Sequence, residues 1–255
     1  MKIGIITAPA VYPYQGDYTS YLKHEYLDWI SQEADPVIIP YDICHTDLKI
    51  YLQHINGILW VGGAIENKKT HTQSQYIQLS KTLEYCYDYI REQNDQGNPF
   101  PIWATCLGYY YLVLLDKYRL KDHYFEHVQD AHKIGKRPLI LYGKSKMRNA
   151  LKGIILEEDA ITHLHIHGFY MNYPLSKEIR IVATDLDDQN KKYITAIEYK
   201  HYPFYGSQFH PERTFNTLSR KVSKKLLKMF ISECKQNKNH WKHGLKQKWD
   251  CVHIM

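Results

Sequence analysis

The sequence lacks the usual marks of secreted and membrane-bound proteins. No run of about 18 apolar residues occurs, which argues against a membrane-spanning helix. No Asn-x-Ser/Thr sequon occurs either, and the apolar run after Met1 is too short for the core of a signal peptide. These absences predict a cytoplasmic protein without a membrane partner. A secreted or lysosomal location would require this chain to be the processed form of a longer precursor.

Cysteine is also scarce, with five copies in 255 residues. They are widely spaced and form no Cys-x-x-Cys pair, which argues against a disulfide framework and against a zinc site. We interpret Cys44, Cys86, Cys234 and Cys251 as ordinary thiols, and Cys251 stands one position too early for a prenylation signal. Cys106 has a different sequence context, considered below.

Positive charge is concentrated near the end of the chain. The formal net charge is +6, and lysines crowd the segments "KVSKKLLKMF" and "KQNKNHWKHGLKQKWD". The plainer interpretation is a solvated helix face followed by a basic tail; the alternative is attraction of an anionic partner such as an acidic substrate. No nucleic-acid-binding motif accompanies these lysines, so we expect no nucleic-acid partner.

In the first half of the chain, short apolar runs alternate with longer segments of helical spacing. The runs predict strands at residues 2–7, 36–40, 57–61 and 100–105, and the longer segments predict helices at 18–34, 47–54 and 72–91. Alternation of this kind is typical of a parallel sheet with helices on both faces.

The pattern changes after about residue 135. Four further strands are predicted in "RPLILYG", "EIRIVATD", "KYITAIEYK" and "FYGSQFH", with a hairpin at 185–192 and a closing helix at 214–235. No internal repeat or linker is visible. We therefore predict a single α/β domain over residues 1–236, with a central, mostly parallel β-sheet flanked by helices, and a basic tail at 237–255.

Cys106 lies between a predicted strand and a predicted helix that starts at Leu107. Gly108 permits the sharp turn of a nucleophile elbow. There the amino end of the helix favours the thiolate, and the Leu107 amide faces a developing oxyanion. The plainer interpretation is a buried cysteine that acts as a small hydrophobe.

A candidate general base follows in "YGSQFHPER". Pro211 ends the apolar strand, and extended geometry would return His210 and Glu212 to the same side. Glu212 would then hydrogen-bond the imidazole and fix its tautomer, which completes a Cys-His-Glu triad with Cys106. An isolated His-x-Glu pair is more often a surface ion pair.

Paired glycines end the apolar run in "INGILWVGG". Gly62 and Gly63 allow backbone amides to approach a substrate closely. One interpretation is a tight turn, and the other is a second oxyanion donor from Gly62 or Gly63.

Together, "INGILWVGG", "ATCLGYY" and "YPFYGSQFHPER" resemble the class I glutamine amidotransferase superfamily and, within it, the gamma-glutamyl hydrolase family. The resemblance extends from Ile3 to about Arg213. It implies a flavodoxin-like α/β fold and cysteine-dependent cleavage of γ-glutamyl bonds in folyl or other poly-γ-glutamates. It also implies Cys106 as nucleophile, His210 as general base and Glu212 as the residue that orients this base.

The same resemblance implies that Gly63 and Leu107 supply the oxyanion-hole amides and that Gly62 contacts substrate. His167, in "HLHIHGFY", matches a histidine at the substrate. Tyr110 would also contact substrate, but it stands where gamma-glutamyl hydrolases usually have Glu and amidotransferases usually have Gln, which leaves the substrate preference open. Val61 replaces a proline before the paired glycines.

His163, His165 and His167 would share one face of a strand, which raises the alternative of a metal cluster. No acidic or cysteine partner has a suitable spacing, so we expect no metal.

The predicted function is thus a hydrolase of γ-glutamyl amides that acts through a thioester and requires no metal or organic cofactor. One alternative is an amidotransferase that supplies ammonia from glutamine to a partner synthetase; Tyr110 and the lack of an attached synthase domain count against it. Another is a catalytically inactive binding homologue, against which the intact triad counts. A homodimer is left open by the sequence.

Overall fold

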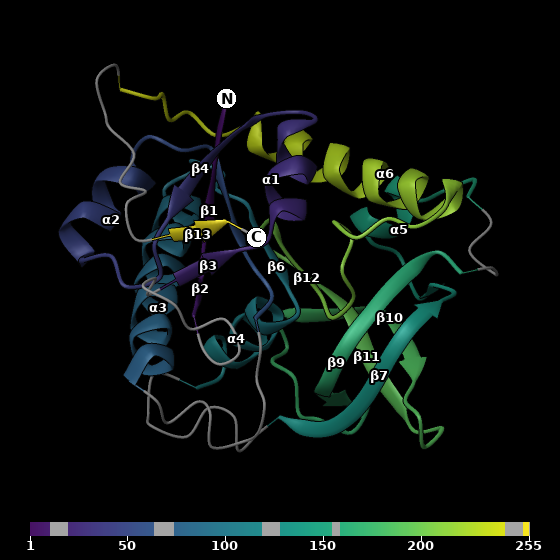
Figure 1. Cartoon of the computed structure of the whole chain (residues 1–255). Coiled ribbons are helices and arrows are strands. Elements are labelled where there is room, and N and C mark those ends of the chain that lie inside the picture. Colours follow the sequence, from purple (N-terminus) through teal and green to yellow (C-terminus); the bar gives the residue numbers. More distant parts are fainter. Residues whose placement is uncertain (11–19, 64–73, 119–127, 155–158, 243–251, 255) are drawn as a thin grey trace.

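The computed structural model describes residues 1–10, 20–63, 74–118, 128–154, 159–242 and 252–254. Within these ranges, ten strands form one sheet whose two halves differ in strand direction (Figure 1). Neighbouring strands of the first half are parallel. In spatial order they are β4 (Asp35–Ile39), β1 (Lys2–Ile6), β5 (Gly57–Trp60), β6 (Ile102–Thr105) and β12 (Phe204–Ser207).

The second half of the sheet is antiparallel and continues from β12. Its strands are β11 (Lys192–Tyr199), β10 (Ile179–Leu186), β8 (Ile140–Leu141), β9 (Ile161–Tyr170) and β7 (Gln129–Arg137). β9 joins β11 only near its end, whereas β7 follows β9 along most of its length, so β7 and β9 form a long ribbon (Figure 1, lower right).

Helices cover both faces of the sheet. On one face α1 (His24–Ser31), α5 (Lys146–Ala150) and α6 (Thr217–Cys234) share a buried apolar cluster. On the other face α2 (His45–Leu52), α3 (Ser74–Asp95) and α4 (Leu107–Leu115) share a second cluster. Of the helices in the described ranges, none has both the length and the apolar character needed to cross a membrane.

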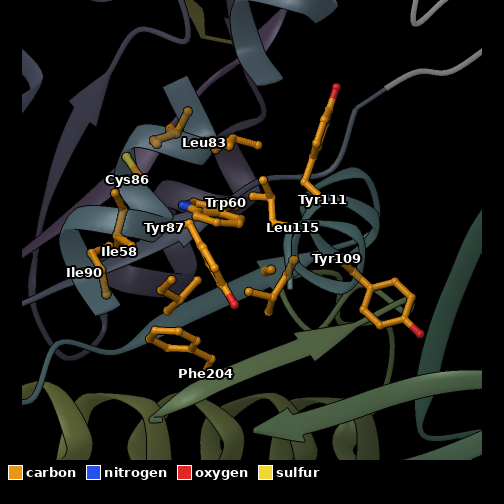
Figure 2. Packing of buried hydrophobic residues seen from close by; sticks show 14 of the residues in the cluster. Ile58, Trp60, Leu83, Cys86, Tyr87, Ile90, Tyr109, Tyr111, Leu115 and Phe204 are labelled. Atoms are coloured by element: carbon orange, nitrogen blue, oxygen red, sulfur yellow. The ribbon is translucent and has the colours of Figure 1, made fainter. Parts of the chain in front are cut away.

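Figure 2 shows how the second cluster is filled. Trp60 from β5 packs in the same cluster as Tyr87 of α3, Leu115 of α4 and Phe204 of β12. All four residues of β5 and all four of β6 are buried, because a central parallel strand is covered on both faces. This packing fixes the carboxyl ends of β5 and β6, where the glycine pair and Cys106 follow.

The predicted single α/β domain is confirmed, and the hairpin at 185–192 joins β10 to β11. Two predicted elements differ in type or continuity, and others differ only in their bounds. The helix expected at 18–34 is wrong at its start: residues 18 and 19 lie outside the described ranges, Ser20–Leu22 is a strand, β3, and α1 begins at His24. The strand expected at 137–143 is divided between β7 and β8, because Pro138 has no amide proton to continue the ladder.

The boundary at residue 236 stays a prediction. Just beyond it, the Asn239 side chain donates to the backbone oxygens of Leu52 and Ile55 at 2.9 and 3.0 Å, next to the start of β5. Farther on, β13 (Val252–Ile254) pairs in parallel with β3, which in turn pairs with β2 (Ala8–Pro9). The start of the tail therefore lies where the parallel strand β5 begins, at the opposite end of the strands from Cys106.

Candidate active site

Cys106 forms a sharp turn between β6 and α4. Its φ of 51° and ψ of −102° lie in a region that residues other than glycine rarely adopt. Its amide donates to the Ser207 oxygen at 2.8 Å. A Cβ added at Gly108 would lie 2.5 Å from the Trp60 carbonyl oxygen, so only glycine lets α4 approach β5 this closely. The structure therefore holds the predicted elbow, with a strained cysteine at its apex.

His210 lies beyond the end of β12 at Ser207, so this strand is shorter than predicted. A turn closed by the Arg213 amide and the His210 oxygen, at 3.1 Å, brings Glu212 back to the imidazole; the extended geometry expected here is wrong. His210 Nδ1 donates to Glu212 Oε1 at 2.6 Å, and both side chains are buried. The His210 amide donates to the Thr162 oxygen of β9 at 2.9 Å, which anchors the turn.

The environment of His210 favours its charged form. Burial by itself lowers the pKa of the imidazole, but the Glu212 carboxylate and the Cys106 sulfur outweigh it and raise this pKa to about 10. Nε2 is buried and has no hydrogen-bond partner in the described part of the chain. A Cβ added at Gly62 would lie 3.0 Å from His210 Cε1 and 3.2 Å from Cys106 Cβ. The protonated ring thus lies beside the elbow.

A cavity of about 230 Å³ opens at this point. Most of the predicted site residues line it: Gly62, Gly63, Cys106, Tyr110, His167 and His210. Glu212 lies behind His210, and Leu107 follows Cys106 at the start of α4. The chain therefore brings all the predicted site residues into one region, at the carboxyl ends of β5 and β6, where open α/β sheets commonly bind ligands.

The two glycines differ in the availability of their amides. The Gly62 amide donates to the Tyr26 hydroxyl at 2.8 Å, so it is already engaged. At Gly63, an added Cβ would lie 2.5 Å from Leu107 Cδ2, so the backbone of Gly63 runs close to the start of α4. This favours Gly63 over Gly62 as a partner of the Leu107 amide in holding an oxyanion.

Tyr110 ties α4 to the β7–β9 ribbon. Its hydroxyl donates to the His167 oxygen at 2.7 Å and accepts from Gln208 Nε2 at 2.9 Å. The His167 ring in turn donates from Nδ1 to Asp130 Oδ1 at 3.1 Å. Tyr110 and His167 therefore border the cavity, and Tyr110 presents a neutral, internally bonded hydroxyl.

The three histidines of β9 are all buried, as strand alternation predicts. His165 Nε2 lies 3.2 Å from both His163 Nδ1 and the Tyr193 hydroxyl. Burial lowers the pKa of His165 to about 3 and that of His163 well below its usual value, so both rings are neutral. No group of three or more His, Cys, Asp or Glu side chains within the described ranges is arranged to hold a metal.

Three residues at this site were not predicted from the sequence. Tyr26 accepts from Gly62 and has its pKa raised by burial and by the Glu212 carboxylate. Gln208 Nε2 lies 3.9 Å from the Cys106 sulfur. Lys23 lines the cavity from the residue before α1. Gln208 stands inside the quoted base segment and could have been found there, whereas Lys23 and Tyr26 fell in a segment interpreted as one amphipathic helix.

Of the remaining cysteines in the described ranges, Cys44 is exposed, and Cys86 and Cys234 are buried free thiols. Burial raises the pKa of Cys86 and of Cys234. Cys251 lies outside the described residues. No feature here gives these thiols a chemical role.

The chain is similar to known proteins in both sequence and fold. The family model for glutamine amidotransferase class-I matches residues 18–229. "Gamma-glutamyl hydrolase B" of Dictyostelium discoideum is 31% identical over 225 residues, which are 83% of this chain and 62% of that protein. "Gamma-glutamyl hydrolase" of Homo sapiens is 28% identical over 246 residues, 88% of this chain and 72% of that protein.

Among solved structures, a candidate GMP synthase component from Thermoplasma acidophilum covers 92% of this chain and 96% of its own, with a TM-score of 0.60 and 18% identity. This similarity concerns the fold alone. The present chain also spans less than two thirds of the length of the Dictyostelium protein.

Proposed function

Because this chain belongs to the class I glutamine amidotransferase family, we propose that it is a cysteine-dependent hydrolase of γ-glutamyl amide bonds, with folyl or other poly-γ-glutamates as substrates. The observation that carries the proposal is the His210–Glu212 pair, bonded at 2.6 Å beside the strained Cys106. The names of the curated relatives support the γ-glutamyl bond as the target.

The first half of the reaction uses the proton that His210 carries. The Cys106 thiolate attacks the γ-carbonyl carbon, and the amides of Gly63 and Leu107 stabilise the oxyanion. When the C–N bond breaks, His210 Nε2 donates its proton to the departing amine, and a thioester remains on Cys106. The raised pKa of His210 suits this step, because the imidazole is protonated at neutral pH.

The second half regenerates the site. The now neutral Nε2 accepts a proton from water, the resulting hydroxide attacks the thioester, and the sulfur leaves as thiolate. Glu212 keeps the proton on Nδ1 throughout and stabilises the imidazolium that forms again. No step draws on a group other than the side chains, backbone amides and water.

The proposed substrate is an anion that a basic protein attracts. Poly-γ-glutamate carries a carboxylate on each residue, and the chain is basic overall. The described start of the tail lies at the opposite end of the strands from Cys106. Capture by Lys238 and Lys242, which belong to this described start, is therefore expected to act through long-range attraction, and replacing both with Gln should change kcat/KM only at low salt. An unchanged kcat/KM at low salt would remove this role.

The test is incubation with folyl-pentaglutamate and, separately, with glutamine, followed by product chromatography. We expect the wild type to shorten the γ-glutamyl chain and Cys106→Ala to release nothing, while a Cys44→Ala control remains active. Ammonia from glutamine without cleavage of the folate would favour the amidotransferase alternative. Failure of the wild type with both substrates would favour the inactive binding homologue.

A further inference from the structure

The cavity beside Cys106 has an uneven distribution of charge. Among the described residues that line it, Lys23 is the one Lys or Arg, and no Asp or Glu is present. The other walls are aromatic, aliphatic, glycine or histidine, including Ile134 and Leu164 from the β7–β9 ribbon. Besides the His210 imidazolium next to Cys106, an anionic substrate that enters this space therefore meets one further cation, the ammonium group of Lys23.

The position of Lys23 is set by the backbone on both sides. It follows β3 directly, keeps extended geometry with φ −74° and ψ 135°, and precedes the first turn of α1. Its carbonyl accepts from the Tyr26 amide at 3.1 Å, which closes that turn. The side chain is half-buried and leaves these two short elements toward the cavity.

Within the described residues, the ammonium group of Lys23 has no ion-pair partner. Glu25 and Glu212 attract the ammonium group from a distance, but each has a closer partner: Glu25 pairs with Arg213 at 3.7 Å, and Glu212 accepts from His210. Burial and the Arg213 guanidinium lower the pKa of Lys23. A partly desolvated cation without a partner is costly, and a carboxylate from a ligand would remove that cost.

We propose that Lys23 is the specificity residue that binds a carboxylate of the substrate in the cavity beside Cys106. The inference rests on the proposed function and refines it, because it restricts the substrates to γ-glutamyl amides with a carboxylate near the reacting carbonyl. That carboxylate is either the α-carboxylate of the acyl half or one on the departing amine. In both cases the loss of Lys23 raises KM more than it lowers kcat.

The kinetic test compares Lys23→Met, Lys23→Arg and, as a matched control, Lys224→Met on the exposed face of α6. The substrates are γ-glutamyl-anilide, 4-aminobutyryl-anilide, which lacks the α-carboxylate, and γ-glutamyl-4-aminobenzoate, which adds a carboxylate to the amine. We expect Lys23→Met to raise KM about 10- to 100-fold for the substrate whose carboxylate Lys23 binds, Lys23→Arg to recover most of this loss, and the control to match wild type. If only 4-aminobutyryl-anilide is insensitive to Lys23→Met, Lys23 binds the α-carboxylate. If both anilides are insensitive, it binds the carboxylate on the amine. An equal response of all three substrates would overturn the proposal.

A second test does not depend on turnover. Alkylation of Cys106 by iodoacetate, which carries a carboxylate, is compared with alkylation by neutral iodoacetamide, and modified peptides are identified by mass spectrometry. The ratio of the two rates should fall about 3- to 10-fold in Lys23→Met and stay near the wild-type value in Lys23→Arg. If the wild type cleaves no γ-glutamyl amide but this ratio still falls, the proposed function fails and the anion site at Lys23 stands. An unchanged ratio in folded Lys23→Met overturns the anion site itself.

Discussion

The parallel and antiparallel halves of the sheet position their site residues by different means. In the parallel half the close contacts are between backbone atoms. Gly108 packs on the Trp60 carbonyl, and the backbone of Cys106 has a strained, positive φ. In the antiparallel half, side chains make the links, as when Tyr110 bonds the His167 oxygen and His165 contacts Tyr193. Cys106 is thus held by close packing and the opposite wall of the cavity by a set of hydrogen bonds.

This difference has an energetic consequence. A close backbone contact fails when a single carbon atom is added, because neither partner can move without shifting a whole element. A hydrogen-bond set loses about 1 kcal/mol for each link removed and retains the rest. We therefore expect single substitutions to be more damaging around Cys106 than on the opposite wall of the cavity, with the His210 turn, which joins both halves, the most sensitive of all.

The largest effect is expected at that junction. Glu212→Gln should lower kcat/KM about 10²- to 10⁴-fold, because the imidazolium loses its counter-charge and its fixed tautomer. Asp28→Asn is the matched control, since Asp28 also bonds a histidine, His24, at 2.9 Å, but on the exposed surface. An equal loss of kcat/KM in both variants would show that the buried His210–Glu212 pair matters no more for activity than the exposed His24–Asp28 pair.

The same pair predicts how stability depends on pH. The folded pKa of His210, about 10, is above the ordinary value of 6.5, so its stabilising contribution is complete below about pH 6.5 and is lost as pH rises toward 10. Denaturant unfolding of the wild type should show this decline, and Glu212→Gln should flatten it. A wild-type curve that rises across this interval would contradict the assignment.

The direct comparison of the two halves uses two glycines. Gly108→Ala places a Cβ 2.5 Å from the Trp60 oxygen, whereas Gly168→Ala in β9 places one 3.1 Å from the Ala131 Cβ. We expect Gly108→Ala to lower kcat/KM about 100-fold and to destabilise the fold by about 3 kcal/mol, and Gly168→Ala to cost about 1 kcal/mol with activity nearly unchanged. Equal losses would remove the distinction between the halves.

A smaller effect is expected from Tyr110→Phe. This change removes two bonds, to the His167 oxygen and to Gln208, and keeps the ring, so the free energy of unfolding should fall by about 2 kcal/mol. The His165 ring still faces the His167 oxygen at 2.9 Å, which limits the movement of β9. Activity should fall less than about 10-fold; a loss as large as that of Gly108→Ala would show that Tyr110 acts on substrate directly.

The smallest effect concerns strain at the elbow. Cys106→Gly should be more stable than Cys106→Ala by about 1 kcal/mol, because glycine adopts a φ of 51° without penalty. At Cys86, in the core of α3, the order should be reversed, since glycine weakens a helix. Thermal unfolding of the four variants checks both signs.

The elbow and the glycine pair could be predicted because their signals are local. A buried run, a cysteine and a glycine two residues later leave few alternatives for the chain near Cys106. The His210–Glu212 contact was also foreseen, but for a wrong reason, since a turn and not an extended strand produces it. Local spacing therefore identified the pair without giving its geometry.

The remaining features depend on pairings between distant segments. β3 is a strand because it pairs with β2 and β13, and no periodicity within "SYLK" reveals those partners. β7 alternates exposed and buried residues only as part of the ribbon with β9, and its sequence "QDAHKIGKR" contains few strong strand formers. For the same reason Lys23 could not be placed at the cavity from sequence.

The central claim is that Cys106 carries the acyl group between the two halves of the reaction. Its most direct test is a rapid acid quench of the wild type during turnover of a γ-glutamyl amide, followed by peptide mass spectrometry. We predict a γ-glutamyl adduct on the peptide that contains Cys106, labile to hydroxylamine as a thioester is and more abundant in Glu212→Gln if that change slows deacylation. Turnover at a normal rate with the adduct on another residue, or in Cys106→Ala, would contradict the account.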